Sequence, residues 1–163
     1  MDENWESQLQ DIWQKLGVIS NDEFIQQLKN HTALLTGSQA IADFEMACAF
    51  DSIGYEKEAE PLYRAALGLG LSGLRRRRAR IQLASTLRNN GKIEESIHIL
   101  REEKANYSDD LNDAVDSFLA LSLSSAGKYN EALSLTLKVI SHHLPRYNRS
   151  LYNYADALHK EDV

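Results

Sequence analysis

Apolar residues recur along this chain at intervals of three, four and seven, and the same arrangement returns in three successive segments. The segments start at Asp43, Arg80 and Asp116. Side chains at these intervals lie on one face of an α-helix, so each run predicts an amphipathic helix. A glycine divides each segment into two such runs, and no window shows the sustained alternation typical of a β-strand. The pattern therefore predicts an all-α fold built from helical hairpins.

The hairpins share fixed positions around their dividing glycines. These glycines are Gly54, Gly91 and Gly127, which are 37 and 36 residues apart. Small residues stand seven positions before each glycine and five after it: Ala47, Ala84 and Ala120 before, and Ala59, Ser96 and Ala132 after. Glycine readily adopts the positive φ that ends a helix, and small side chains allow two helices to approach closely. This ladder predicts stacked pairs of antiparallel helices.

The same residues carry a resemblance to a known family. The stretches "AFDSIGYEKEAEPLYRAAL" and "SLSSAGKYNEALSLTLKV" hold small and aromatic residues at Ala47, Gly54, Ala59, Tyr63, Ala66, Ala120, Gly127, Tyr129 and Ala132. Residues 38–145 therefore resemble three tetratricopeptide repeats, which are helix–turn–helix units of about 34 residues. The middle repeat departs from the pattern, with Ser96 and Glu103 where small residues are usual. The whole chain is similar to a small family of bacterial tetratricopeptide-repeat proteins without an assigned activity.

The resemblance implies a right-handed α-solenoid, and the flanking segments extend it. Residues 1–35 predict a helical hairpin, interpreted as a degenerate repeat because Gly17 fits the ladder. Within it, Ser20 and Glu23 have the spacing of a capping box. Residues 146–163 predict a C-terminal capping helix that begins around Pro145 and packs through Tyr147, Leu151, Tyr154 and Leu158. Self-association of this helix is the alternative.

Charge is distributed unevenly along the 163 residues. The net charge is −6 and the pI is about 5.4, whereas a general nucleic-acid binder is usually strongly basic. Residues 1–70 hold 12 acidic and 4 basic side chains, a net charge of −8, and residues 71–163 have a net charge of +2. Opposite charges at the two ends suit a head-to-tail homodimer.

The sequence also suggests a cellular compartment. A lone cysteine, Cys48, cannot form an internal disulfide. The stretch "MDENWESQLQ" is acidic and amphipathic, unlike a signal peptide, and no apolar run approaches the roughly 20 residues that span a bilayer. We expect a soluble cytoplasmic protein with no membrane partner.

The stretch "SGLRRRRARIQL" concentrates positive charge in an acidic chain, at Arg75, Arg76, Arg77, Arg78 and Arg80. At 100° per residue these side chains spread around a helix, with Arg76 and Arg80 leaning toward its packed side. We interpret the stretch as a solvated helix start, with Ser72 as N-cap and ion pairs to Glu56, Glu58 or Glu60. The alternative is an anion-binding or nucleic-acid-binding site.

The resemblance also implies a binding surface, because the first helices of such repeats line a concave face. The implied positions are Phe44, Cys48, Arg78, Ile81, Ser85, Arg88, Asn89, Ser117 and Leu121. An unidentified peptide or protein would bind there, with an acidic side chain paired to Arg78 or Arg88. Capture of a peptide's terminal carboxylate is not expected, since Phe44 and Cys48 occupy places that would need polar or basic groups.

No arrangement of residues points to catalysis, a cofactor or a metal. The histidines are His31, His98, His142, His143 and His159, and none has the spacing of a metal site. The "SHH" stretch is interpreted as a helix end that favours partly protonated histidines. The glycines of "LGLGLSG" follow a predicted helix and lack the lysine of a phosphate loop. The sequence therefore predicts a non-catalytic interaction module.

Overall fold

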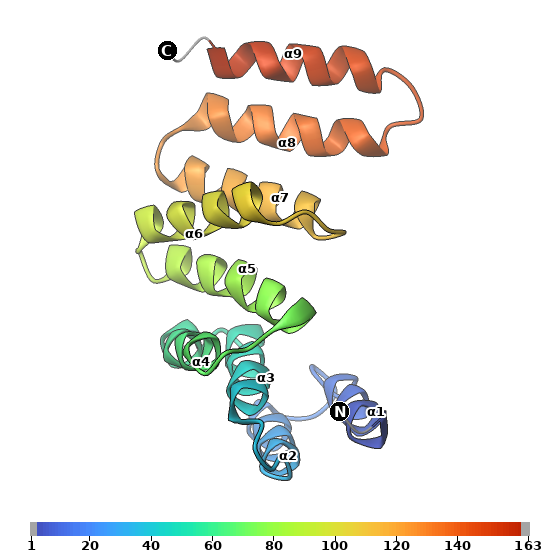
Figure 1. The fold of residues 1–163 in the computed structure, drawn as a ribbon, viewed down its shortest axis with the longest axis vertical. Helices are drawn as coiled ribbons and strands as arrows, with labels where there is room; N and C mark the ends of the chain where they lie inside the picture. Colours follow the sequence, from blue (N-terminus) through green and yellow to red (C-terminus); the bar gives the residue numbers. More distant parts are fainter. Residues whose placement is uncertain (1–2, 161–163) are drawn as a thin grey trace. The chain divides into compact units, whose positions relative to one another are not determined.

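The computed structural model describes residues 3–160, apart from the side chains of residues 159 and 160. The described part of the chain consists of nine α-helices joined by short turns and contains no strand (Figure 1). The helices are α1 (Glu3–Trp13), α2 (Asn21–Thr32), α3 (Gln39–Ser52), α4 (Glu56–Gly68), α5 (Gly73–Asn89), α6 (Ile93–Asn106), α7 (Asn112–Ser125), α8 (Tyr129–His143) and α9 (Asn148–Lys160). This order confirms the all-α fold class.

The predicted turn glycines occur between paired helices. Gly54 joins α3 to α4 with φ of 83°, and Gly91 joins α5 to α6 with φ of 79°. An L residue with a Cβ rarely adopts this conformation, so glycine lets the chain reverse without strain. Gly17 and Gly127 have φ of 75° and 78° at equivalent turns, so the ladder extends into the N-terminal hairpin.

The small residues of the ladder lie inside the helix pairs, as predicted. Ala47, Ala59 and Ala84 have no exposed surface, and Ala120 and Ala132 are 5% and 7% exposed. Close helix packing explains why this register tolerates only small side chains.

Ser96 replaces alanine in the middle repeat because its hydroxyl has partners. Its Oγ donates a hydrogen bond to the Ala84 carbonyl oxygen at 2.6 Å and lies 2.8 Å from the Ser122 Oγ. The Ser96 side chain is fully buried, so these contacts remove the cost of an unsatisfied polar group. This departure from the family pattern therefore links α6 to both α5 and α7.

The chain divides into two compact units, an N-terminal unit of residues 1–79 and a C-terminal unit of residues 80–163. The boundary falls inside α5 and not at a repeat boundary. This boundary does not test the division into a hairpin at residues 1–35, repeats at 38–145 and a capping helix at 146–163, which stays a prediction.

In the N-terminal unit, the first hairpin shares a core with α3. Trp5 and Leu9 of α1 pack with Phe24 and Leu28 of α2 and with Ala49 of α3. The Trp5 indole donates to the His31 carbonyl oxygen at 3.2 Å, and the two rings stack 4.7 Å apart. The predicted N-cap of α2 is confirmed, because the Ser20 hydroxyl accepts the Glu23 backbone N–H.

In the C-terminal unit, α9 lies along α8 (Figure 1). Its packed face passes through Ala155, which is fully buried, and the half-buried Leu151 and Leu158. Tyr147 and Tyr154, which the sequence pattern placed on that face, are instead 76% and 74% exposed.

For Tyr147, the reason for the difference lies in where α9 starts. The helix begins at Asn148, so Pro145 is not in its first turn and Tyr147 precedes it, with a positive φ of 69°. Residues 161–163 of the predicted capping segment and the His159 side chain lie outside the described part of the chain.

Replacing Ala59 with leucine tests the helix packing directly. We expect Ala59→Leu to lower the free energy of unfolding by about 1–3 kcal/mol, because three more carbon atoms must enter a filled space. Ala65→Leu is the matched control, since Ala65 lies exposed on the same helix. Urea denaturation followed by circular dichroism measures both, and equal stability of the two variants would contradict the packing described.

Candidate functional site

Arg75, the first residue of the arginine stretch, connects three helices of the N-terminal unit. Its Nε donates to the Glu45 Oε1 of α3 at 2.9 Å, and its two Nη atoms donate to the Glu6 carboxylate of α1 at 3.0 and 2.7 Å. Burial tends to lower the pKa of this guanidinium, but the hydrogen bonds to Glu6 and Glu45 outweigh it and raise the pKa. Arg75 therefore remains charged and serves the fold.

Glu45 needs this partner because its side chain is only 3% exposed. The Trp13 indole supplies a second hydrogen bond, from Nε1 to the Glu45 Oε2 at 3.2 Å. A buried carboxylate without such partners would be strongly destabilising. The contacts of Arg75 are thus a structural requirement of the N-terminal unit.

Arg80 has the equivalent role in the C-terminal unit. Its Nε donates to the Glu103 Oε1 at 2.9 Å and its Nη2 to the Glu102 Oε2 at 2.5 Å. The Glu103 side chain has no exposed surface. Glu103 stands where the repeat pattern expects a small residue, so this departure and Arg80 form one buried ion pair.

For Arg75 and Arg80, these partners correct the expectation from sequence, which was Glu56, Glu58 or Glu60; for Arg76 and Arg77 that expectation stays a prediction. Arg75 pairs instead with Glu45, 30 positions earlier, and with Glu6, 69 positions earlier. Arg80 pairs with Glu102 and Glu103, which are 22 and 23 positions later. The helical wheel did not single out Arg77, which is only 3% exposed and makes polar contacts of its own. Arg77 and the fully buried Ala79 lie 200° apart on α5, so this part of the helix is covered from more than one side.

Arg78 is the member of the stretch that faces outward. It is exposed, and its Cζ lies 5.3 Å from the centroid of the Phe44 ring. Within the part of the chain that the structure describes, no carboxylate pairs with Arg78. Arg76 is half-buried and, like Arg77, has polar partners. The five arginines therefore have three different environments and do not form one basic face.

Arg78 borders a cleft in the N-terminal unit of about 540 Å³. The cleft is lined by the start of α3, the connection that follows α4 and the first turns of α5: Gly37, Ser38, Ala40, Ile41, Leu69, Gly70, Leu71, Ser72, Leu74, Arg75 and Arg78. This volume lies within the range of small-ligand and peptide side-chain pockets. We call it the Arg78 cleft.

Several predicted groove residues belong to the core instead. Phe44 has no exposed surface, Cys48 is 2% exposed and Ile81 is 5% exposed, so a partner could not contact them without rearrangement. Cys48 is a buried free thiol. It lies beside Tyr63, whose pKa is raised by burial first and by Cys48 and Asp51 second. These side chains fill the space between α3 and α4.

The remaining predicted groove residues keep exposed surface. Asn89, Ser117 and Leu121 are exposed, and Ser85 and Arg88 are half-buried. The Arg88 Nη2 donates to the Asn89 Oδ1 at 3.0 Å, but its Nε is buried without a hydrogen-bond partner. The hydrogen bond to the neutral Asn89 amide does not neutralise the charge of Arg88. The sequence placed Arg88 on the binding surface only through its position in the repeat. No sequence pattern indicated that its Nε would lack a hydrogen-bond partner.

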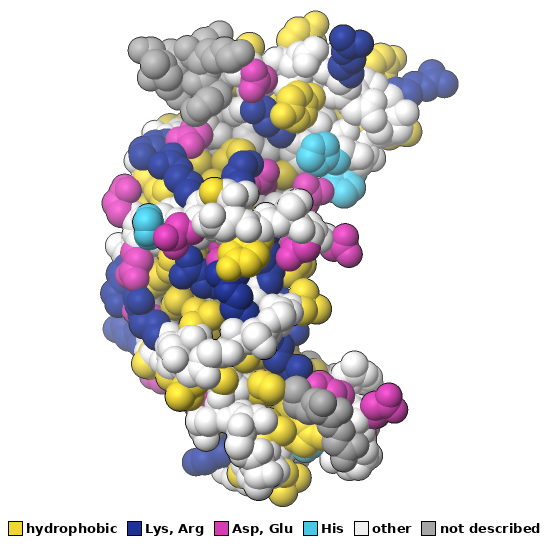
Figure 2. All heavy atoms as spheres, viewed as in Figure 1, with side chains coloured by type: hydrophobic (Ala, Val, Ile, Leu, Met, Phe, Trp, Pro, Cys, Tyr) yellow, Lys and Arg dark blue, Asp and Glu magenta, His cyan; other side chains and the backbone are white. Residues whose placement is uncertain are grey.

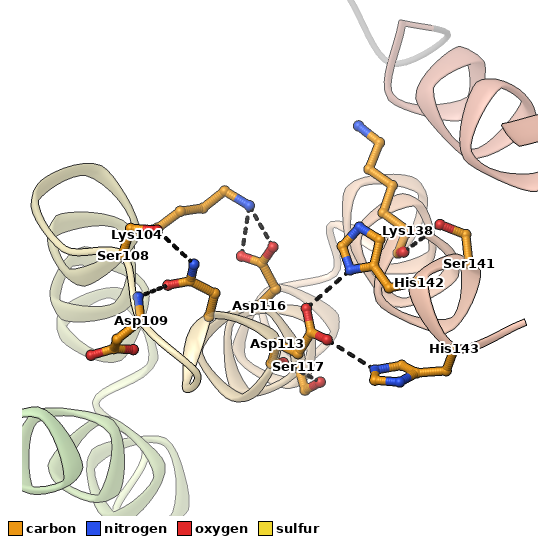
Figure 3. Close-up of polar contacts among 11 residues, drawn as sticks. Lys104, Ser108, Asp109, Asp113, Asp116, Ser117, Lys138, Ser141, His142 and His143 are labelled. Carbon is orange, nitrogen blue, oxygen red and sulfur yellow. Dashed lines mark hydrogen bonds and ion pairs between the residues drawn. The ribbon is translucent and has the colours of Figure 1, made fainter. Parts of the chain in front are cut away.

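A cluster that the sequence pattern did not predict joins α7 to α8 (Figure 3). The Asp113 carboxylate lies between two adjacent histidines, with His142 Nδ1 3.2 Å from Oδ1 and His143 Nε2 2.9 Å from Oδ2. Asp113 is in the first turn of α7 and the histidines are in the last turn of α8, where each charge suits the helix dipole. Antiparallel pairing of α7 and α8 brings these two turns together. The predicted helical hairpin was therefore the feature of the sequence from which this contact could have been inferred.

A second cleft, of about 460 Å³, lies in the C-terminal unit. Its walls carry both charges, already paired: Lys104 with Asp116 at 2.6 and 2.7 Å, and Arg101 with Glu131 at 2.7 Å. On the face drawn in Figure 2, basic and acidic side chains are interspersed, which does not suit a phosphate backbone.

Metal sites and membrane spans are absent from the described residues. They contain no group of three or more His, Cys, Asp or Glu side chains that could hold a metal ion. Every helix among them is too short or too polar to cross a bilayer.

Comparisons with known proteins agree with the helical repeats. A family model described as Tetratrico peptide repeat matches residues 40–158. Two crystal structures of Podosopora anserina putative kinesin light chain TPR-like repeats are similar in fold. One of them, a variant with a single substitution, has a TM-score of 0.73 and 17% sequence identity, and the match covers 99% of this chain and 90% of that chain. The other has a TM-score of 0.72 and 18% sequence identity, and the match covers 97% of this chain and 88% of that chain. No curated protein matches the chain.

The buried pair of Arg80 and Glu103 yields a double-mutant prediction. Arg80→Met should lower the free energy of unfolding by about 1.5–3 kcal/mol, because the buried Glu103 carboxylate loses its charge-assisted hydrogen bond from the Arg80 Nε, and adding Glu103→Leu should recover part of the loss. Arg101→Met is the control, since the Arg101 side chain in its pair with Glu131 is 49% exposed and should contribute about 0–1 kcal/mol. Urea denaturation measures all four proteins. Similar losses for Arg80→Met and Arg101→Met would contradict this assignment.

The Asp113 cluster predicts a pH dependence of stability. Partial burial raises the pKa of Asp113, but the hydrogen bonds from His142 and His143 outweigh it and hold the pKa below its ordinary value. The stabilisation is therefore present above the unfolded-state pKa of about 3.9 and is lost as pH falls through the lower, folded-state value. Asp113→Asn should be less stable than wild type at pH 5, with the difference vanishing in stronger acid.

Urea denaturation between pH 6 and pH 2.5 measures this difference. Asp110→Asn, at an exposed position in the connection before α7, is the control and should show no such trend. A constant difference between Asp113→Asn and wild type across the range would disprove the role of the cluster.

Proposed function

Since the chain belongs to the tetratricopeptide repeat family, whose fold serves as a scaffold for protein–protein interaction, we propose that it is a non-catalytic module for binding a protein or peptide partner. The partner binds on the face formed by the first helices of the repeats. In the C-terminal unit this face includes Ser85, Arg88 and Asn89 of α5 and Ser117 and Leu121 of α7. We place this function in the cytoplasm, because the lone Cys48 cannot form an internal disulfide.

The observation that carries the proposal is the unsatisfied guanidinium of Arg88. A buried donor without an acceptor costs free energy, more so when it belongs to a charged group. A carboxylate that approaches the side of a guanidinium accepts from Nε and one Nη together. When the Arg88 side chain turns to expose Nε, which is buried in the unbound protein, a partner's acidic side chain would accept from Nε and replace the contact of Nη2 with Asn89.

Exposed apolar surface on α7 supports the same interpretation. Leu121 is 47% exposed and stands one repeat after Ser85 in the repeat pattern. Protein interfaces combine an apolar centre with a polar rim, and an exposed leucine could contribute to such a centre. The nucleic-acid alternative loses support because Arg75 and Arg80 are neutralised by glutamates and Arg77 is buried.

Photo-cross-linking from one side chain tests the proposal. A benzoylphenylalanine at position 121 should form an adduct with a specific protein in native lysate, and Arg88→Gln should abolish it. Position 133 is the control, since Leu133 is also 47% exposed but lies on the second helix of its pair. The same adducts from both positions, or an adduct unchanged by Arg88→Gln, would refute the proposal. Circular dichroism confirms that each variant is folded.

Self-association is a second candidate, supported by exposed aromatic side chains near the C-terminus. Tyr147, Tyr152 and Tyr154 are 76%, 44% and 74% exposed around α9. Aromatic side chains are enriched at the centres of protein interfaces. Under this candidate a homodimer forms through α9, and light scattering that gives the mass of a single chain at micromolar concentration eliminates it.

A further inference from the structure

The Arg78 cleft has features that the proposed function does not explain. Arg75 also lines it, but the Arg75 donors are committed to Glu6 and Glu45. Arg78 is the second guanidinium of the cleft, and among the described residues it contacts the Phe44 ring and no carboxylate. The cleft therefore offers one available positive charge.

Contact with Phe44 prepares Arg78 for an anion. Phe44 is fully buried, so its ring gives the guanidinium a fixed surface to lie on. A guanidinium has five N–H donors, and a contact of Cζ with one ring leaves donors available to a ligand. The side chain is thus partly ordered before binding, which lowers the entropic cost of capturing a carboxylate.

Apolar side chains complete the cleft. Leu69 and Leu74 are 57% and 64% exposed, and both line it. Leu71, at 7% exposure, and the half-buried Ile41 also contribute to the lining. Exposed leucines next to an unpaired charge indicate a ligand that presents an apolar group and an anion close together.

We propose that the Arg78 cleft binds a partner segment in which an aspartate or glutamate adjoins a leucine-like side chain. The carboxylate pairs with Arg78, and the apolar side chain covers Leu69 and Leu74. The inference rests on the proposed function only in taking the ligand to be a protein, and it concerns a site in the other unit from Arg88. A single available guanidinium matches the single charge of a carboxylate, whereas a phosphate dianion would keep half its charge uncompensated.

Nuclear magnetic resonance with two matched peptides tests the inference. The probes are acetyl-Leu-Glu-Leu-amide and acetyl-Leu-Gln-Leu-amide, added to the ¹⁵N-labelled full chain. We expect the acidic peptide to shift the amide signals of Gly37, Gly70 and Gly73, which lie in or beside the cleft lining. The neutral peptide should bind with an affinity about tenfold lower, because it lacks the charge-assisted hydrogen bond to Arg78.

Variants assign the effect to Arg78. Arg78→Gln should remove the preference for the acidic peptide, and Arg78→Lys, which keeps the charge, should retain part of it. Arg146→Gln, which makes the same charge change at an exposed position in the C-terminal unit, should behave as wild type. Signal dispersion shows whether each variant is folded, and Arg78 is exposed with one described contact, so folding should be unaffected.

Three results would overturn the inference: equal binding of both peptides, unchanged acidic preference in Arg78→Gln, or the same shifts from inorganic phosphate at the same concentration. The last would identify a general small-anion site. None of these results alters the cross-link from position 121 or its dependence on Arg88, so the two proposals can fail separately.

Discussion

Glu45 and Glu103 are the most deeply buried carboxylates in the described part of the chain, and much of the surrounding structure follows from their need for positive charge. The Glu45 and Glu103 side chains are 3% and 0% exposed. An isolated buried carboxylate would cost several kcal/mol even after relaxation, more than most single contacts contribute. Arg75 and Arg80 supply the compensating charges at 2.9 Å each. The arginine stretch, conspicuous in an acidic chain, is therefore first of all part of the two cores.

Because Arg75 and Arg80 are paired with buried glutamates, a different arginine of the stretch is available to bind a partner. Register along α5 directs Arg75, Arg77 and Arg80 to partners or to the interior, and Arg78 alone among these four to an exposed place over Phe44. Arg88, two to three turns later, retains an unsatisfied Nε for a different reason, since its described hydrogen bond is to a neutral amide. Arg78, in a cleft that Leu69 and Leu74 also line, is suited to an acidic protein segment, and a helical repeat has an extended surface on which to present it.

In the C-terminal unit, charges join successive helices and leave little net field on the surface. Asp113 joins α7 to the end of α8, Lys104 joins α6 to α7, and Lys138 joins α8 to α9 through Asp156 at 2.8 Å. Exposed pairs of this kind contribute at most about 1 kcal/mol each. Their main effect is to pair bases with acids on successive helices.

The sequence by itself determined the helices, their turns and the small-residue ladder, because these depend on local periodicity and on the conformational freedom of glycine. Positions such as Ala59, Ala84 and Gly91 could be assigned from the amino-acid pattern alone. Tertiary structure alone decided what the side chains contact. It buried Phe44 and Cys48, exposed Tyr154, paired Arg75 with Glu6 across 69 positions, and placed Asp113 between two histidines. Helical periodicity gives the direction of a side chain around its own axis, whereas burial and pairing depend on which other helices surround it.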